Sequence, residues 1–210
     1  MCIRDRHDTV DTASEVHEPE AFDAETPLFI MYTSGTTGKP KGLVHTMGGY
    51  LTQASWSYEF LFANPDEAAR EADVHWCTAD LAWVTAHTYE IYGPLSNGAT
   101  QVLYEGTPNT PHPGRHFEII ERYKVTSYYT APTLVRSLMG WFPDGVPDTW
   151  DLSSIRLLGT VGEAVNPEAW RWLRQHVGRG TVPVIDTWWQ SETGATILSP
   201  RPSCSRIPRQ

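Results

Sequence analysis

The chain has 210 residues with a formal net charge of −9, and 40% of its residues are hydrophobic. This length can bury one sizeable core, and the nine tryptophans argue against a disordered chain. The acidic balance and the lack of a basic stripe argue against nucleic-acid binding, and no apolar run is long enough to span a membrane.

The three cysteines, Cys2, Cys77 and Cys204, are widely spaced and form no CxxC pair. This pattern argues against a disulfide framework or a zinc site, and it predicts a reducing, cytoplasmic environment. His112 and His116 have a spacing that metal ligands can have, but Pro and Gly lie between them and no cysteine is near. We expect both histidines to lie in a solvent-facing loop.

The predicted elements alternate between strands and helices along the chain. Seven acids and no Lys or Arg lie between His7 and Thr26, which indicates that residues 1–26 are an exposed leader. The apolar run at 28–31 ends in a glycine-rich turn and predicts a buried strand that feeds a loop. Gly93-Pro94 and Asn97-Gly98 predict turns. Helices are expected at 51–62, 115–123, 132–141 and 167–177, and a short polar helix is expected to begin at residue 65. Strands are expected at 74–77, 100–104, 125–129, 155–161 and 182–186. This order predicts an α/β fold with much of its sheet parallel.

The loop that follows the first strand has the composition of an anion-binding segment. Residues 32–42 contain three glycines, four Ser or Thr hydroxyls and two lysines. Glycines let backbone N–H groups approach an anion, hydroxyls donate hydrogen bonds and lysines add positive charge, so the segment suits a polyphosphate. The spacing is not that of a Walker loop. The alternative is a flexible surface turn.

The run YTSGTTGKPKG at 32–42 resembles the phosphate-binding signature of the adenylate-forming superfamily. The following residues, 45–50, narrow the resemblance to the AMP-forming acetyl-CoA synthetases. The resemblance implies layered β-sheets flanked by helices, as in part of the large N-terminal domain of that fold. It implies ATP phosphate binding by Thr33, Ser34, Gly35, Thr36, Thr37, Gly38, Lys39 and Lys41. It also implies catalytic roles for Thr36, Lys39 and Glu192.

A second segment, Trp76 to His87, is similar to the pattern WCTADxGWVTGH of the same family. The resemblance implies that Val84 and Thr85 line the acetate pocket. A core strand followed by an aromatic helix is the alternative interpretation. Glu90 occupies a stretch that is normally apolar in the family, and the sequence offers no account of it.

A third segment, 157–167, resembles the family's adenine-binding run GSVGEPxNPEAW. A glycine-containing turn at a strand end lets backbone lie flat against a purine. The resemblance implies adenine contact by Gly162, Glu163 and Ala164, and places Val161 in the acyl pocket. Ala164 replaces the usual proline, so we expect a less rigid turn. A strand, turn and conventionally capped helix is the alternative.

The fourth segment, 186–194, resembles the family's DTWWQTETG. In the family the position of Trp189 closes the acyl pocket and restricts it to short acids, and that of Glu192 helps to bind Mg²⁺ with ATP, which suits a hard oxygen ligand. An aromatic core pair is the alternative for the two tryptophans. The resemblance places around the nucleotide Asp186, Thr187, Trp188, Gln190 and Ser191.

The resemblance implies a ligase that uses ATP, Mg²⁺ and CoA. Acetate attacks the α-phosphorus of ATP to give acetyl-AMP and pyrophosphate, and the CoA thiol then displaces AMP. Two alternatives stay open: a synthetase for propionate or another short acid, and a nucleotide-binding fragment without catalytic activity.

By family standards the chain is incomplete. Residues 27–200 correspond to the central part of the AMP-binding domain, residues 201–210 depart from the pattern, and the C-terminal lid domain is absent. Residues 1–6 are expected to be non-native sequence. We therefore expect the 210-residue chain alone to have at most a trace of adenylation activity.

Overall fold

The computed structural model describes residues 3–34 and 38–201, together with the side chains of residues 7–34 and 38–201. Its centre is a five-stranded sheet in the order β4-β3-β5-β6-β7, with every neighbouring pair parallel. The strands are β3 (Val74–Cys77), β4 (Thr100–Gln101), β5 (Ser127–Thr130), β6 (Leu157–Thr160) and β7 (Val184–Asp186). The predicted α/β class with a parallel sheet is confirmed.

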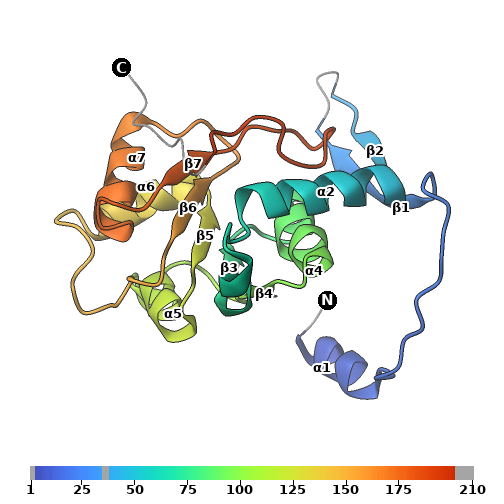
Figure 1. Cartoon of the computed structure of the whole chain (residues 1–210), viewed down its shortest axis with the longest axis horizontal. Helices are drawn as coiled ribbons and strands as arrows, with labels where there is room; N and C mark the ends of the chain where they lie inside the picture. The colour runs from blue at the N-terminus through green and yellow to red at the C-terminus, as the bar shows by residue number, and fades with distance from the viewer. Residues whose placement is uncertain (1–2, 35–37, 202–210) are drawn as a thin grey trace.

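Successive residues of each strand point to opposite faces of the sheet. Side chains therefore pack on both faces, and the sheet is the middle of three layers. Trp76 and Tyr128 pack into one hydrophobic cluster, whereas their neighbours Cys77 and Tyr129 pack into another. The strands β3, β5, β6 and β7 are therefore buried on both faces, as in other parallel sheets covered by helices, whereas β4 at the edge is not. Figure 1 shows helices on both sides of the central strands.

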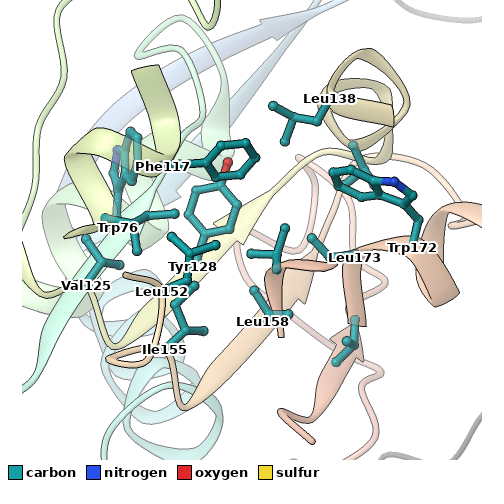
Figure 2. Close-up of a cluster of buried hydrophobic side chains, with 14 of the residues drawn as sticks. Trp76, Phe117, Val125, Tyr128, Leu138, Leu152, Ile155, Leu158, Trp172 and Leu173 are labelled. Atoms are coloured by element: carbon teal, nitrogen blue, oxygen red, sulfur yellow. The ribbon is translucent and has the colours of Figure 1, made fainter. Parts of the chain in front are cut away.

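The larger cluster lies between the sheet and three helices, α5 (Arg115–Tyr123), α6 (Pro132–Trp141) and α7 (Pro167–Trp172). Figure 2 shows Trp76 and Tyr128 from the strands facing Phe117 of α5 and Leu138 of α6. Each such large apolar side chain contributes about 1.5–3 kcal/mol when it is fully buried. The predicted bounds of the helices at 115–123 and 132–141 are confirmed.

The helix after Asn166 begins at Pro167 and continues through the π-helical turn η3 (Leu173–Val177) to Gly178, as predicted. The Asn166 side chain makes no capping hydrogen bond. Proline at the first helical position is sufficient to start this helix, because its missing N–H has no partner there in any case.

The second face of the sheet is covered by α2 (Met47–Leu61) and the π-helical turn η2 (His87–Tyr92). Three short helices complete this side: η1 (Glu67–Ala72), α3 (Val84–Ala86) and α4 (Gly93–Ser96). The turn predicted at Gly93-Pro94 is wrong, because these residues open α4 with proline in its first turn. The turn at Asn97-Gly98 is confirmed.

A two-stranded antiparallel hairpin, β1 (Pro27–Thr33) and β2 (Lys41–Thr46), precedes α2. The strand predicted at 28–31 is confirmed, but its expected burial is wrong: the Ile30 side chain is 58% exposed and no residue of β1 is fully buried. Only one face of the hairpin packs, and it does so through Phe29, whose ring lies 4.9 Å from Tyr50 of α2 and 5.2 Å from His87 of η2. An apolar run therefore does not distinguish a half-covered hairpin strand from a buried one.

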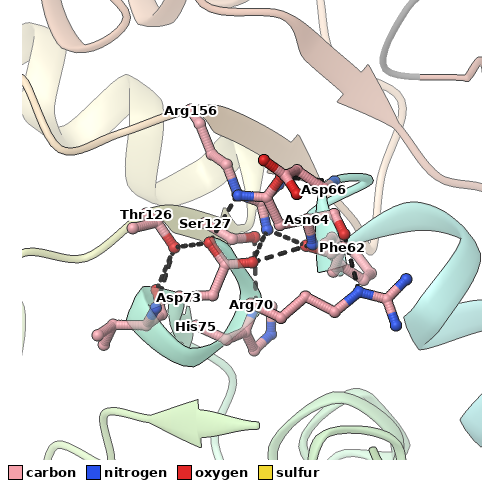
Figure 3. A network of polar contacts seen from close by, with 10 residues as sticks. Phe62, Asn64, Asp66, Arg70, Asp73, His75, Thr126, Ser127 and Arg156 are labelled. Atoms are coloured by element: carbon pink, nitrogen blue, oxygen red, sulfur yellow. Dashed lines mark hydrogen bonds and ion pairs between the residues drawn. The ribbon is translucent and has the colours of Figure 1, made fainter. Parts of the chain in front are cut away.

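Polar contacts join the amino ends of β3, β5 and β6, as Figure 3 shows. Arg156 donates to both carboxylate oxygens of Asp73, at 2.8 Å from Nε and 2.5 Å from Nη2. Asp73 also accepts from the Asn64 N–H at 2.9 Å and the Thr126 hydroxyl at 3.0 Å. We call Asp73, Thr126 and Arg156 the amino-edge network. Bidentate, charge-assisted contacts of this kind are among the strongest hydrogen bonds in proteins.

Two histidines are buried and neutral. His75 lies between Ser127 and the Tyr89 carbonyl, and burial lowers its pKa to about 3. His116 lies in α5, contacts the Tyr128 hydroxyl at 2.7 Å, and has a pKa lowered by burial to about 4. The prediction of a solvent-facing loop holds for His112 but is wrong for His116, because the helix turns the latter into the core.

The chain begins with α1 (Ile3–Thr12), and residues 7–25 are exposed throughout, as the acidic composition of the leader predicts. In the part of the chain that the structure describes, no helix is long and apolar enough to cross a membrane.

Candidate active site

A cavity of about 440 Å³ opens at the carboxyl ends of β3, β5 and β6. Open parallel sheets bind ligands at this edge, and the volume lies within the range of small-molecule sites. The segment after β3 contributes Thr78 to Asp80, Trp83 and Thr85, β5 and its continuation contribute Tyr129 to Ala131, and the turn after β6 contributes Val161 to Glu163. Cys77, Pro108 and Leu134 complete the lining. The segment that resembles the acyl pocket (Trp76 to His87) and the segment that resembles the adenine site (157–167) thus meet in one cavity.

Of the four residues assigned to the acyl pocket, Thr85 and Val161 line the cavity. Trp189 lies behind a lining residue: its indole N–H donates to the Tyr129 hydroxyl at 3.4 Å, and its ring meets Tyr89 edge-on at 5.6 Å. Val84 is buried but is not part of the lining. The aromatic-core alternative holds for Trp189 only, because Trp188 is 53% exposed.

The turn assigned to adenine leaves β6 along the cavity. Gly162 has φ of +95°, a conformation that favours glycine, and no atom lies within 4 Å of where a Cβ would stand. Glu163 lies at the rim, where Arg136 donates to both of its carboxylate oxygens at 2.9 Å. Hydrogen bonds from Thr133 and then Arg136 hold the pKa of Glu163 below its usual range. Ala164 is exposed and does not line the cavity.

Asp186 and Thr187 end β7 next to this turn. The Thr160 hydroxyl donates to Asp186 at 2.6 Å, while burial raises the pKa of this carboxyl. The Thr187 hydroxyl donates to the Thr160 carbonyl at 2.9 Å and lies 2.6 Å from the Tyr129 hydroxyl. Both side chains thus contact the protein, and neither lines the cavity.

The segment after Thr187 crosses from the sheet to the hairpin, as the red trace in Figure 1 shows. His45 of β2 donates to the Ser191 carbonyl at 2.8 Å, and the Gln53 amide of α2 donates to the Thr196 carbonyl at 3.0 Å. These contacts bring the proposed nucleotide segment next to the strand that follows the phosphate loop. The Gln190 and Glu192 side chains are exposed.

The segment predicted to bind phosphate joins β1 to β2. Gly35, Thr36 and Thr37 lie outside the described residues. Gly38 has φ of +79°, and Ser34, Lys39 and Lys41 are exposed, while Thr33 is half-buried. Among the described residues, neither lysine has an ion-pair partner, and none of the loop lines the cavity. The positive charges are therefore available to an anion.

Glu90 of η2 lies behind the cavity wall formed by residues 77–80. Its carboxyl lies beside the Cys77 thiol and the Ala79 backbone, and no described residue is hydrogen-bonded to its Oε1 atom. Burial raises the pKa of Glu90 to about 7, and burial followed by the neighbouring Glu90 raises the pKa of Cys77. Near neutral pH this carboxyl is therefore partly protonated.

A comparison with protein families decides where this architecture belongs: the model of the AMP-binding enzymes matches residues 3–209. The chain belongs to the AMP-binding enzyme family. It is 61% identical over 195 residues to an acetyl-coenzyme A synthetase of Mycolicibacterium smegmatis, covering 93% of this chain and 20% of that protein. Acetyl-coenzyme A synthetases of Mycobacterium bovis and Streptomyces coelicolor are each 59% identical over 196 residues, covering 93% of this chain and 29% of those proteins. The chain thus spans between a fifth and a third of the length of these relatives.

The resemblance to AMP-forming acetyl-CoA synthetases, recognised in the sequence, is confirmed by these relatives. The assignment of individual residues to phosphates, adenine and acyl group stays a prediction. The geometry contributes one new point to it, because Thr85, Val161, Gly162 and Glu163 share one cavity.

The residues present fit a magnesium ion that arrives with ATP. Mg²⁺ is usually held by one or two carboxylates together with substrate phosphates and water. Glu192 is an exposed carboxylate without an ion-pair partner among the described residues, so its oxygens are available. The same part of the chain contains no cluster of three His, Cys, Asp or Glu side chains suited to a resident metal.

Sequence reasoning missed several residues of this AMP-binding enzyme. Tyr129 and Thr130 line the cavity from β5, and Arg136 holds Glu163 from α6. The available signal was the order of the elements: the residues that end a strand of a parallel sheet meet at one edge. The run YYTAP at 128–132, a strand that ends before proline, could have been marked on that ground.

Proposed function

We propose that this chain forms the nucleotide and acetate site of an AMP-forming acetyl-CoA synthetase. The observation that carries the proposal is the cavity at the carboxyl edge of the sheet, where acyl-pocket residues Thr85 and Val161 adjoin adenine-site residues Gly162 and Glu163. The acetyl-coenzyme A synthetases that share 52–61% identity with the chain support the same reaction.

In the proposed first step, a carboxylate oxygen of acetate attacks the α-phosphorus of ATP, and the bond to the bridging oxygen breaks to release pyrophosphate. In the second step the CoA sulfur attacks the acetyl carbonyl carbon, AMP leaves, and the thiol proton passes to solvent. No covalent bond to the enzyme is needed. CoA contacts are not assigned to residues of this chain, and by itself the chain is proposed to have at most trace adenylation activity.

Both reactants of the first step are anions, so the site must reduce their repulsion. Thr33, Ser34, Lys39 and Lys41 are proposed to donate to the phosphates, together with the backbone of residues 35–38. Bound Mg²⁺, held by Glu192, would neutralise charge on the departing pyrophosphate. Thr36 is proposed to contact the same phosphates. The nucleotide is proposed to lie against residues 162–164, within reach of Asp186, Thr187, Trp188, Gln190 and Ser191.

Acetate is proposed to lie between Thr85 and Val161, with Trp189 behind Tyr129 limiting the depth of the pocket. Val84 is proposed to support this wall from behind. Protonation of Glu90 supports acetate binding, because a neutral carboxyl behind residues 77–80 does not repel the substrate's carboxylate. Absence of nucleic-acid partners and a cytoplasmic location stay predictions from charge and cysteine content.

The test compares two non-hydrolysable acyl-adenylate mimics, acetyl and butyryl, by calorimetric titration of the chain and of Trp189→Gly. We expect the unsubstituted chain to bind the acetyl mimic more tightly. We expect Trp189→Gly to shift the ratio of affinities towards butyryl by roughly tenfold or more per methylene accommodated. Trp56→Ala, which removes an exposed tryptophan of α2, is the control.

An unchanged ratio in Trp189→Gly would remove Trp189 from the pocket. Binding of neither mimic by the unsubstituted chain would overturn the proposed site. Tighter binding of a propionyl mimic than of the acetyl mimic would assign the site to a longer acid.

A further inference from the structure

Three side chains form a polar cluster at the rim of the cavity, which we call the rim clamp: Thr133, Arg136 and Glu163. Arg136 Nη2 lies 2.9 Å from each carboxylate oxygen of Glu163. The Thr133 hydroxyl donates to the same carboxylate and accepts from Arg136 at 2.9 Å. Thr133 and Arg136 are three residues apart and therefore lie on one face of α6.

The rim clamp connects two walls of the cavity. Ala131 and Leu134, at the start of α6, line the cavity opposite Gly162 and Glu163, which follow β6. The clamp therefore fixes the distance between the helix and the turn at the cavity mouth.

The turn at 161–164 is anchored at its first residue, because Val161 is buried and its N–H donates to the Thr130 carbonyl at 3.1 Å, but residues 162–164 are exposed. Gly162 has a positive φ and open space around its Cα, so no packed side chain holds it. Ala164 leaves the backbone freer than a proline would. After the turn, Val165 lies next to Asp186 of β7. The side chain of Glu163 is thus the contact through which α6 can order the turn.

We propose that Arg136 is a positioning residue that, with Thr133, holds the Glu163 carboxylate and so orders residues 161–164 against the adenine ring of ATP. This inference rests on the proposed function. Arg136 and Glu163 are 44% and 41% exposed. An exposed ion pair of this kind contributes little to the free energy of unfolding of the whole chain. We therefore expect the pair to affect the order of the turn at 161–164 and not the stability of the fold. A turn that is ordered before binding loses less conformational entropy when the ligand arrives.

The first experiment measures amide hydrogen exchange in the chain without ligand. Arg136→Met is expected to raise the exchange rate of the 162–164 amides by about tenfold, while the rates in β5 and β6 stay the same. Arg136→Lys should restore part of the protection, since it keeps the positive charge but replaces the guanidinium group. The matched control is Arg70→Met, which removes another exposed arginine–glutamate pair, Arg70–Glu59. Unchanged rates at 162–164 in Arg136→Met, or an equal rise in the control, would overturn the inference.

The second experiment compares binding of ATP with binding of tripolyphosphate, which has no adenine. Arg136→Met is expected to weaken ATP binding by about five- to tenfold and to leave tripolyphosphate binding unchanged. Equal weakening of both would overturn the inference, because Arg136 would then contact phosphate directly. If the unsubstituted chain binds no ATP, the proposed function fails, whereas the exchange rates still decide whether the clamp orders the turn.

Discussion

The two edges of the central sheet differ in how their polar groups are used. At the amino edge, Arg156 and Asp73 are mostly buried and satisfy each other together with Thr126. At the carboxyl edge, a cavity remains open, the Oε1 atom of Glu90 has no partner among the described residues, and the hydroxyl of Thr85 has no hydrogen bond within the described part of the chain. The difference teaches that polar contacts close the amino edge, whereas the carboxyl edge combines paired groups such as Thr160 and Asp186 with a cavity that stays open for a ligand.

The largest expected effect comes from the amino edge. Arg156→Met leaves the Asp73 carboxylate partly buried without its cation, so we expect the free energy of unfolding to fall by about 3 kcal/mol. Urea denaturation measures the loss. Arg70→Met breaks an exposed ion pair with Glu59 and one hydrogen bond to the Asn64 carbonyl, and should cost about 1 kcal/mol. Equal losses for the two variants would contradict the special role of the amino-edge network.

Glu90 gives the second expected effect, through its pH dependence. Its folded pKa is raised from 4.5 to about 7, so the proton stabilises the fold. This contribution is fully present below about pH 4.5 and is lost as the pH rises through 7. Glu90→Gln stays neutral, so relative to the unsubstituted chain it should gain about 1–3 kcal/mol between pH 5 and pH 8.

The measurement for Glu90 is the unfolding free energy of both proteins at pH 5 and pH 8. Glu59→Gln, at an exposed position, is the control and should show no such gain. A difference between Glu90→Gln and the unsubstituted chain that does not change with pH would show that Glu90 keeps an ordinary pKa.

The smallest expected change in stability is at Thr85. Because its hydroxyl has no partner among the described residues, Thr85→Val should alter the unfolding free energy by less than about 0.5 kcal/mol. It should nevertheless weaken binding of the acetyl-adenylate mimic. Thr126→Val, the matched change at the amino edge, removes the hydroxyl that donates to Asp73 and should cost about 1–3 kcal/mol. A large loss of stability in Thr85→Val would contradict the proposal that the Thr85 hydroxyl, unlike the Thr126 hydroxyl, does not stabilise the fold.

The sequence was sufficient where local signals decide the structure. Helical spacing of apolar residues at 115–123, and proline at 132, set the bounds of α5 and α6. The sequence was insufficient for β1, because an apolar run does not show whether one or both faces of the strand will be covered by other elements. It also misplaced His116, since the loop signal from Pro113 and Gly114 ends one residue before the helix begins.

The candidate site was predictable in its parts and not in its assembly. The motifs around Thr85 and Gly162 were visible, but their meeting in one cavity depends on β5 lying between β3 and β6. Arg156 and Asp73 are 83 residues apart, and no local pattern links them. The raised pKa of Glu90 could not be predicted from the sequence either, because it follows from the burial of this side chain in the folded protein.

Adjacent residues of one strand in this protein have different neighbours. Tyr128 packs under α5 and α6, whereas Tyr129 packs towards α2 and η2 and borders the cavity. Substitutions on the two faces should therefore combine nearly additively, because the two side chains pack into different hydrophobic clusters. The helices behind Tyr128 could then be redesigned for greater stability while the ligand-facing layer keeps its shape.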